Sequence, residues 1–231
     1  MDYSGNFSDI KHLHRQAVDI IDQINLHSEK IRRGQVKCHL PECRHCELPS
    51  GNFKRHEARR RRFYVPVEQI IQVVFGWLIR WKYRGCEKTL TDYPEFALPH
   101  KRYTLPMIAA YSHQYVNDDQ TTYRGLIGKM PVGYPDSEKQ MDHCTIHRWI
   151  STLGGYCGIV RKAQDLIVQH DPGSSICRQL ANLSVHPAKY RSTRRKGLLM
   201  QCRQLLKLED LYRFAFGVSI FPNLATRCGF S

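Results

Sequence analysis

The chain has 231 residues, 42% of them hydrophobic, and carries 35 Lys and Arg against 21 Asp and Glu, which gives a formal net charge of +14. This length and apolar content can form a sizeable core, but no apolar stretch reaches the ~18 residues that a membrane-spanning helix needs. The N-terminal residues lack the features of a signal peptide, so we expect a cytoplasmic protein with no membrane partner. The large positive excess favours a polyanionic partner, and nucleic acid is the first candidate.

The N-terminal segment, residues 1–35, is predicted to contain an amphipathic helix from about 8 to 31. Apolar residues recur there at helical spacing, and Gly34 follows the last turn. The segment includes His-Leu-His at 12–14, which matches the His-hydrophobic-His signature of rolling-circle-type nucleases. That site needs both histidines on the same face of a strand, whereas a helix places them on different faces. We therefore expect this helix to pack on the rest of the protein or to contact a partner.

The pattern of residues 36–104 is that of β-strands. The stretches RRRRFYVPV and WLIRWKY are rich in β-branched and aromatic residues, and in the second the apolar side chains alternate with Arg80 and Lys82. Helical stretches then follow one another over 105–231, interrupted by a loop with Pro and Gly at 130–140. We therefore predict an α+β fold, with a small β module followed by a mainly α-helical domain.

A cluster of cysteines and histidines, CHLPECRHCE, precedes the first predicted strand. Cys43 and Cys46 have the Cys-x2-Cys spacing that presents two thiolates to one zinc ion, and such a turn needs further ligands from elsewhere. Cys38 lies just ahead of this pair, and Cys86 is the next cysteine along the chain. In a cytoplasmic protein we expect the nine cysteines to be reduced. The isolated cysteines are expected to be small buried hydrophobes: Cys157, Cys177 and Cys202.

The stretches CRHC, FKRHEARRRRFYVPV and RGCEKTLTDYPEFALPHKRYT, within residues 38–105, resemble the zinc-ribbon module of small bacterial proteins associated with transposases. In that family a first Cys-x2-Cys pair is followed by a basic segment and two strands. A second Cys-x2-Cys pair then runs into Gly-Lys/Arg-Thr-Phe, a Leu-Pro turn and a Pro-x-x-Tyr element before a helix. This sequence departs from the pattern at one position, because Tyr83 stands where the second pair has its first cysteine.

The resemblance implies a structural Zn²⁺ held by Cys43, Cys46 and Cys86. Structural zinc sites take four ligands, and Cys38 is our first choice for the fourth. The other candidates for that position are His39 and His56. The alternative is a relic ribbon that binds no zinc and is stabilised by ordinary packing, with its cysteines as free thiols.

The resemblance extends to TTYRGLIGKM and CTIHRWISTLGG, which resemble the helix-turn-helix that follows the ribbon in such proteins, at about 121–155. Asp142 is the expected N-cap of the second helix and Gly154-Gly155 its end. The expected core residues of this helix are Ile146, Trp149, Ile150 and Leu153. Generic packing of three helices is the alternative interpretation. Because a recognition helix reads base edges from its N-terminal turns, the candidates for base contact are His143, Thr145, His147 and Arg148.

Two basic runs are candidates for contacts with phosphates, which supply the sequence-independent part of nucleic-acid affinity. In KRHEARRRR the candidates are Lys54, Arg55, Arg59, Arg60, Arg61 and Arg62. In KYRSTRRK they are Arg191, Arg194, Arg195 and Lys196. A charge run is usually only a solvated surface, so these runs support a nucleic-acid partner without deciding for it.

Catalytic constellations are hard to find in this sequence. Acidic residues are scattered: Asp118 and Asp119 lie at a predicted turn, where capping is the more common role, and Glu209 lies on a basic helix. We therefore predict a non-catalytic DNA-binding protein, with DNA ahead of RNA, that recognises a site for a mobile genetic element, a defence system or transcriptional control. One alternative is an adaptor that binds a transposase or reverse transcriptase. The other is a metal-dependent nuclease that uses Asp118, Asp119 or the histidines.

Overall fold

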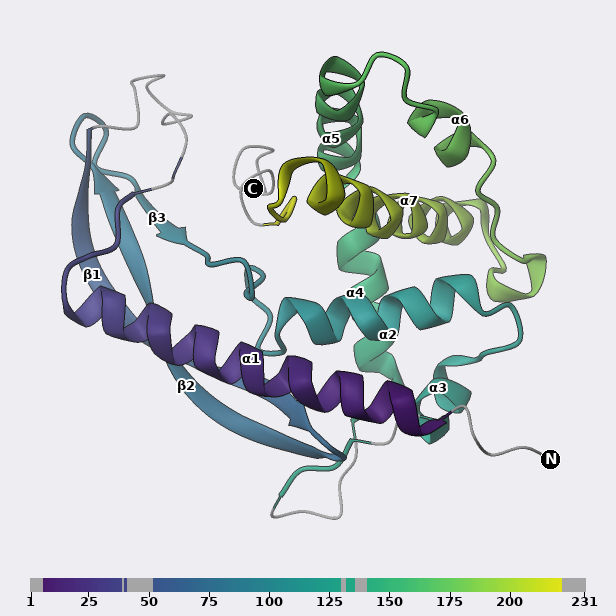
Figure 1. Ribbon diagram of the computed structural model, residues 1–231, viewed down its shortest axis with the longest axis horizontal. Coiled ribbons are helices and arrows are strands. Elements are labelled where there is room, and N and C mark those ends of the chain that lie inside the picture. The colour runs from purple at the N-terminus through teal and green to yellow at the C-terminus, as the bar shows by residue number, and fades with distance from the viewer. Residues whose placement is uncertain (1–5, 39, 41–51, 130–131, 136–140, 222–231) are drawn as a thin grey trace. The chain divides into compact units, whose positions relative to one another are not determined.

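The computed structural model describes residues 6–38, 40, 52–129, 132–135 and 141–221 (Figure 1). The elements follow in the order α1 (Asn6–Arg32), β1 (Phe53–Val67), β2 (Ile70–Tyr83), β3 (Thr89–Asp92), α2 (Leu105–Asn117), α3 (Tyr123–Lys129), α4 (His143–Gly154), α5 (Cys157–His170), α6 (Ile176–Ala181), η2 (Pro187–Lys189) and α7 (Thr193–Phe216). The described residues confirm the α+β fold, with an antiparallel sheet of order β1-β2-β3 followed by a mainly α-helical region. Within these ranges, every helix is too short or too polar to cross a bilayer.

The chain divides into two compact units. The first unit comprises residues 1–107 and 131–140, and the second comprises 108–130 and 141–231. The described part of the predicted loop, residues 132–135, thus belongs to the first unit, with the sheet. Gly133 forms two backbone hydrogen bonds near the turn of the β1–β2 hairpin. Its N–H donates to the carbonyl of Gln69 (2.9 Å), and its carbonyl accepts from the N–H of Ile71 (2.8 Å).

The predicted N-terminal helix is confirmed as α1. It ends at Arg32, and Gly34 follows the last turn as predicted, with a left-handed backbone (φ +70°) that glycine tolerates at no steric cost. In this turn the N–H of Gln35 donates to the carbonyl of Lys30 (2.9 Å). Residues 12–14 are helical, so the strand that a rolling-circle nuclease site requires is not formed there.

Two hydrophobic clusters form the core of the first unit. In one, Ile20 and Ile24 of α1 pack against Phe63, Val65 and Leu78 of the hairpin, along which α1 lies (Figure 1). In the other, Ile31 and Leu40 pack against Phe53, Ile79, Trp81 and Tyr83. Gly76 permits the close approach of α1 in the first cluster, because a Cβ atom there would lie 2.8 Å from Cγ2 of Ile24.

The second unit is built around α4 and α7. The residues of α4 predicted to be core, Ile146, Trp149, Ile150 and Leu153, are all buried. On α7 the buried residues include Leu199, Cys202, Leu205 and Leu206. The prediction for the isolated cysteines is confirmed for Cys202 and is wrong for Cys157 and Cys177, which are exposed. Cys157 opens α5 and Cys177 follows the start of α6, where Ile159 and Ile176 supply the buried positions instead.

Candidate nucleic-acid interface

Helix α4 presents the residues predicted to contact bases. Asp142 caps it as predicted, with its side chain accepting a hydrogen bond from the N–H of Cys144 (2.6 Å). Because Ile146, Trp149 and their neighbours occupy the buried face, the opposite face exposes His147 and Arg148. The two other candidates, His143 and Thr145, are partly exposed on the first turn.

The start of α7 carries the basic run KYRSTRRK. Ser192 caps this helix by accepting from the N–H of Arg195 (3.2 Å), and Arg191, Arg194 and Lys196 are exposed. Arg195 is partly buried, and its guanidinium donates to the hydroxyl of Ser151 on α4 (2.8 Å) and to that of Tyr123 on α3. The structure thus brings together two of the predicted contact sets. We call the residues of these two sets together the α4–α7 surface. They are His143, Thr145, His147, Arg148, Arg191, Arg194, Arg195 and Lys196.

Tyr123, the first residue of α3, contacts two residues of this surface, His147 and Arg195. Its ring stacks on Tyr115 of α2, with ring centres 4.0 Å apart and planes 7° from parallel, and meets His147 edge-on at 5.6 Å. Partial burial lowers the pKa of His147, and the charges of Arg195 and Arg148 lower it further. His147 is therefore biased toward its neutral form at physiological pH, in a positive local potential.

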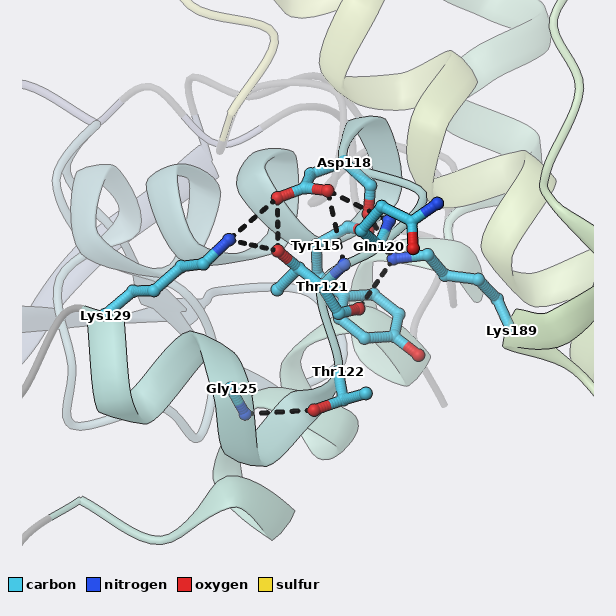
Figure 2. A network of polar contacts seen from close by, with 8 residues as sticks. All are labelled: Tyr115, Asp118, Gln120, Thr121, Thr122, Gly125, Lys129 and Lys189. Atoms are coloured by element: carbon cyan, nitrogen blue, oxygen red, sulfur yellow. Dashed lines mark hydrogen bonds and ion pairs between the residues drawn. The ribbon is translucent and has the colours of Figure 1, made fainter. Parts of the chain in front are cut away.

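The turn between α2 and α3 is held by a polar network (Figure 2). Asp118 has the capping role predicted for it, since its carboxylate accepts from the N–H groups of Gln120 (3.0 Å) and Thr121 (3.2 Å). It also pairs with Lys129 (3.3 Å). The Thr121 hydroxyl, followed by the Gln120 N–H and the Lys129 ammonium, lowers the pKa of the Asp118 carboxyl to about 2. These contacts give Asp118 a structural role in the turn.

Lys189, at the start of the second basic run, belongs to the same network. Its ammonium donates to the carbonyls of Tyr115 (2.8 Å), Thr121 (2.8 Å) and Asp118, and lies 4.1 Å from the centre of the Tyr115 ring. Burial lowers its pKa, although the nearby Asp118 and Asp119 oppose that shift. Lys189 therefore anchors η2 to the end of α2.

The first basic run lies on β1, in the other unit. Most of its candidates are exposed: Lys54, Arg55, Arg59, Arg60 and Arg62. Arg61 is partly buried, and its guanidinium donates to the carbonyls of Leu98 (3.2 Å) and Lys101. Burial lowers the pKa of Arg61. Arg61 thus holds the chain at 98–101 against the sheet, a structural role that its place in a charge run did not indicate.

The predicted zinc ligands fall into two groups. Cys43 and Cys46 lie outside the described residues, as does the alternative ligand His39. Cys38 and Cys86 are described, and both border the apolar cluster around Phe53. Tyr83, at the position of the missing cysteine, is fully buried and meets Phe53 edge-on with ring centres 4.8 Å apart. Tyr83 is thus a core residue, and the alternative ligand His56 is exposed on β1 at its register shift.

A group of potential metal ligands also lies at the start of α4. The ligand atoms of Asp142, His143 and Cys144 lie within 4.8 Å of one another. These residues are consecutive, and Asp142 and Cys144 are exposed. The Asp142 oxygen already accepts the capping hydrogen bond from the Cys144 N–H. Their proximity follows from the geometry of the helix cap, which makes this a weak candidate for a metal centre.

Sequence reasoning missed the residues that join the candidates, namely Tyr123, Ser151 and Tyr115. Their signal in the sequence is slight: Tyr123 directly follows the turn after Asp118, at the start of a helical stretch. Comparison of the chain with protein-family models, with curated proteins and with solved structures finds no match in any of the three.

Proposed function

We propose that the chain is a non-catalytic DNA-binding protein whose second unit recognises a duplex through the α4–α7 surface. In this proposal α3 and α4 form a helix-turn-helix, and the first turns of α4 enter the major groove. Arg148 would favour guanine, and Thr145 a phosphate or a thymine methyl group. The exposed basic residues of α7 would contact phosphates next to this groove. The biological role would be recognition of a site for a mobile element, a defence system or transcriptional control.

The observation that carries this proposal is the contact between Arg195 and Ser151, which are 44 residues apart in the chain. Through it, the start of α7, which carries the basic run, is joined to α4 one turn beyond His147. Duplex DNA carries closely spaced phosphates, and it presents base edges in a groove wide enough for a helix. A surface with one exposed helix flanked by arginines matches both features.

Arg148→Gln is expected to lower the affinity of the protein for its preferred duplex by about tenfold and to relax the preference at one base pair, because a bidentate Arg–guanine contact is worth about 1–3 kcal/mol. The measurement is selection from a random duplex pool, followed by anisotropy titration of the enriched sequence. Arg194→Gln with Lys196→Gln should instead weaken binding to all duplexes alike. It should reduce the salt slope by about 0.9 for each phosphate that the variant no longer neutralises. Arg161→Gln, an exposed change on α5, is the control.

The adaptor alternative gives the opposite pattern. Duplex affinity would be unchanged by Arg148→Gln and by the α7 double variant, while a stable complex forms with a transposase or reverse transcriptase. Such a result would refute recognition through the α4–α7 surface.

We also propose that the first unit binds one structural Zn²⁺ through Cys38, Cys43, Cys46 and Cys86, as a zinc-ribbon-like module. Support comes from Cys38 and Cys86, which are far apart in the chain but border the same apolar cluster. Thiolates are the ligands that structural zinc prefers. Such an ion would tie the chain before β1 to the turn after β2, and its binding free energy would then contribute to folding.

Elemental analysis of the purified protein is expected to find about one zinc per chain, because a four-thiolate set matches structural zinc. Cys86→Ser and Cys43→Ser should each lose the metal and lower the unfolding temperature of the first unit. Cys177→Ser, which alters an exposed cysteine of the second unit, should keep it. If Cys38→Ser keeps the zinc, the fourth ligand is His39 or His56 instead of Cys38. A wild-type protein without zinc would refute the metal site.

A further inference from the structure

One face of the β1–β2 hairpin exposes aromatic and basic side chains together. The strand register pairs three positions on this face, and we call them the ribbon face: Arg60 with Trp77, Arg62 with Phe75, and Tyr64 with Val73. Phe75 is 45% exposed and Val73 41%, and Arg60 and Arg62 are exposed as well. Large apolar side chains with this exposure, side by side with arginines, indicate a binding surface.

The ribbon face is open at Phe75 and Val73, whereas Tyr64 packs edge-on against Tyr103 and Tyr134. It is open there because the core lies on the other face of the hairpin. Side chains alternate along a strand, so Phe63 and Leu78 point away from the ribbon face, into the cluster beneath α1. Beyond Trp77, toward the end of the hairpin that carries Phe53, the side chains on this same face are covered by Ile31 and Leu40. The exposure of Phe75 and Val73 is thus confined to the middle of the hairpin.

The charge of the ribbon face is positive. The guanidinium carbon of Arg60 lies 3.9 Å from the centre of the Phe75 ring, and that of Arg62 lies 5.9 Å from it. Two cations therefore lie close to one exposed aromatic ring, with the Arg60 guanidinium over one of its faces. The nearest carboxylate along β1 is Glu57, which is on the opposite side of the strand and pairs with Arg59 and Arg80. It does not offset the charge around Phe75.

We propose that the ribbon face binds an unpaired nucleic-acid strand, with a base stacked on Phe75 and the neighbouring phosphates held by Arg60 and Arg62. A duplex keeps its base faces inside the stack and offers phosphates and base edges, so it would leave Phe75 and Val73 exposed. An unpaired strand presents the flat apolar face of each base, and stacking on aromatic side chains is how proteins bind such strands without reading their sequence. The inference rests on the proposed function only in that both ligands are nucleic acids, since it assigns a second site in the other unit.

The test is an anisotropy titration of the full chain with an unpaired oligonucleotide of about 12 nucleotides, within the span that single binding modules cover. The same sequence is titrated as DNA, as RNA and as a DNA duplex. Phe75→Leu is expected to weaken binding of the unpaired strand by about tenfold, because leucine keeps the apolar bulk but cannot stack. Phe75→Tyr, which keeps an aromatic ring, should bind the unpaired strand as tightly as the wild type does. Arg60→Gln should lower the salt slope, whereas Arg84→Gln, an exposed arginine beyond β2, should not.

The two proposals fail in different ways. Arg148→Gln should leave affinity for the unpaired strand unchanged while lowering affinity for the preferred duplex. Equal affinity of wild type, Phe75→Leu and Arg60→Gln for the unpaired strand would overturn the ribbon-face proposal and leave recognition by α4 intact. A drop in duplex affinity as large as the drop in single-strand affinity on Phe75→Leu would also overturn it, because the ribbon would then act on paired DNA. Comparison of the DNA and RNA arms identifies the strand that the ribbon face prefers.

Discussion

Gly154→Ala is expected to destabilise the second unit by about 3 kcal/mol, the upper part of the usual range for overpacking a core. A Cβ atom at this position would lie 2.1 Å from the carbonyl oxygen of Leu198 and 2.9 Å from its carbonyl carbon. Both are backbone atoms of α7, so no side-chain rotation can make room. The two helices must therefore move apart, which also opens the core between them. Thermal or urea unfolding, followed by circular dichroism, measures the loss.

Gly197→Ala is the matched control, since Gly197 lies on α7 next to Leu198 and a Cβ atom there meets nothing within 4 Å. Alanine is the better helix former, so this change is expected to stabilise α7 by up to about 1 kcal/mol. If the two variants unfold at the same midpoint, the crossing of α4 and α7 is less close than the structure has it. Because α4 and α7 both contribute to the α4–α7 surface, Gly154→Ala should also weaken duplex binding.

The elements predicted correctly from the sequence are those that local signals determine. Helix α4 is the clearest case: Asp142 supplies the cap, Ile146 and Ile150 supply the apolar stripe, and Gly155 follows its end. Helix α1, which ends just before Gly34, follows from the same kind of signal. Alternation of apolar and basic residues identified the second half of β2 as a strand. In each case the decisive residues lie within one or two turns of the element that they form.

The roles of individual arginines and lysines could not be predicted in this way. Arg61 and Arg195 are parts of charge runs in the sequence, and nothing near them marks them as different from Arg60 or Arg194. Their roles depend on partners that folding brings from far away, the carbonyl of Leu98 for one and the hydroxyl of Ser151 for the other. Two of the residues predicted to contact phosphate therefore also form hydrogen bonds within the protein.

Glu209 illustrates the same limit for an acid. It lies on the basic helix α7, as predicted from the sequence, and it pairs there with Arg213. It also accepts hydrogen bonds from the hydroxyl of Ser219 and the N–H of Ile220, both at 2.8 Å, and is buried. It therefore anchors the chain that follows α7. The ribbon face was missed for a related reason: Val73 and Phe75 lie in an unbroken apolar run, where the pattern does not tell the exposed face from the buried one.

Lys189→Met is expected to destabilise the second unit by about 2 kcal/mol, because a buried carbonyl that loses its hydrogen-bond donor costs about 1–3 kcal/mol. Methionine keeps the apolar length of lysine but cannot donate to the carbonyls of Tyr115, Asp118 and Thr121. The measurement is urea unfolding at neutral pH, with Lys162→Met on the exposed side of α5 as the control for loss of charge.

The same variant tests how the α4–α7 surface is held. The turn anchored by Lys189 leads directly into Tyr123, whose hydroxyl accepts from Arg195 and whose ring meets His147. If this path positions the basic side chains, Lys189→Met should lower duplex affinity under conditions in which the protein is still fully folded. Lys162→Met should leave duplex affinity unchanged. Loss of stability with full retention of duplex affinity would mean that Arg195 keeps its place through Ser151 alone, and that the network around Asp118 serves only the fold.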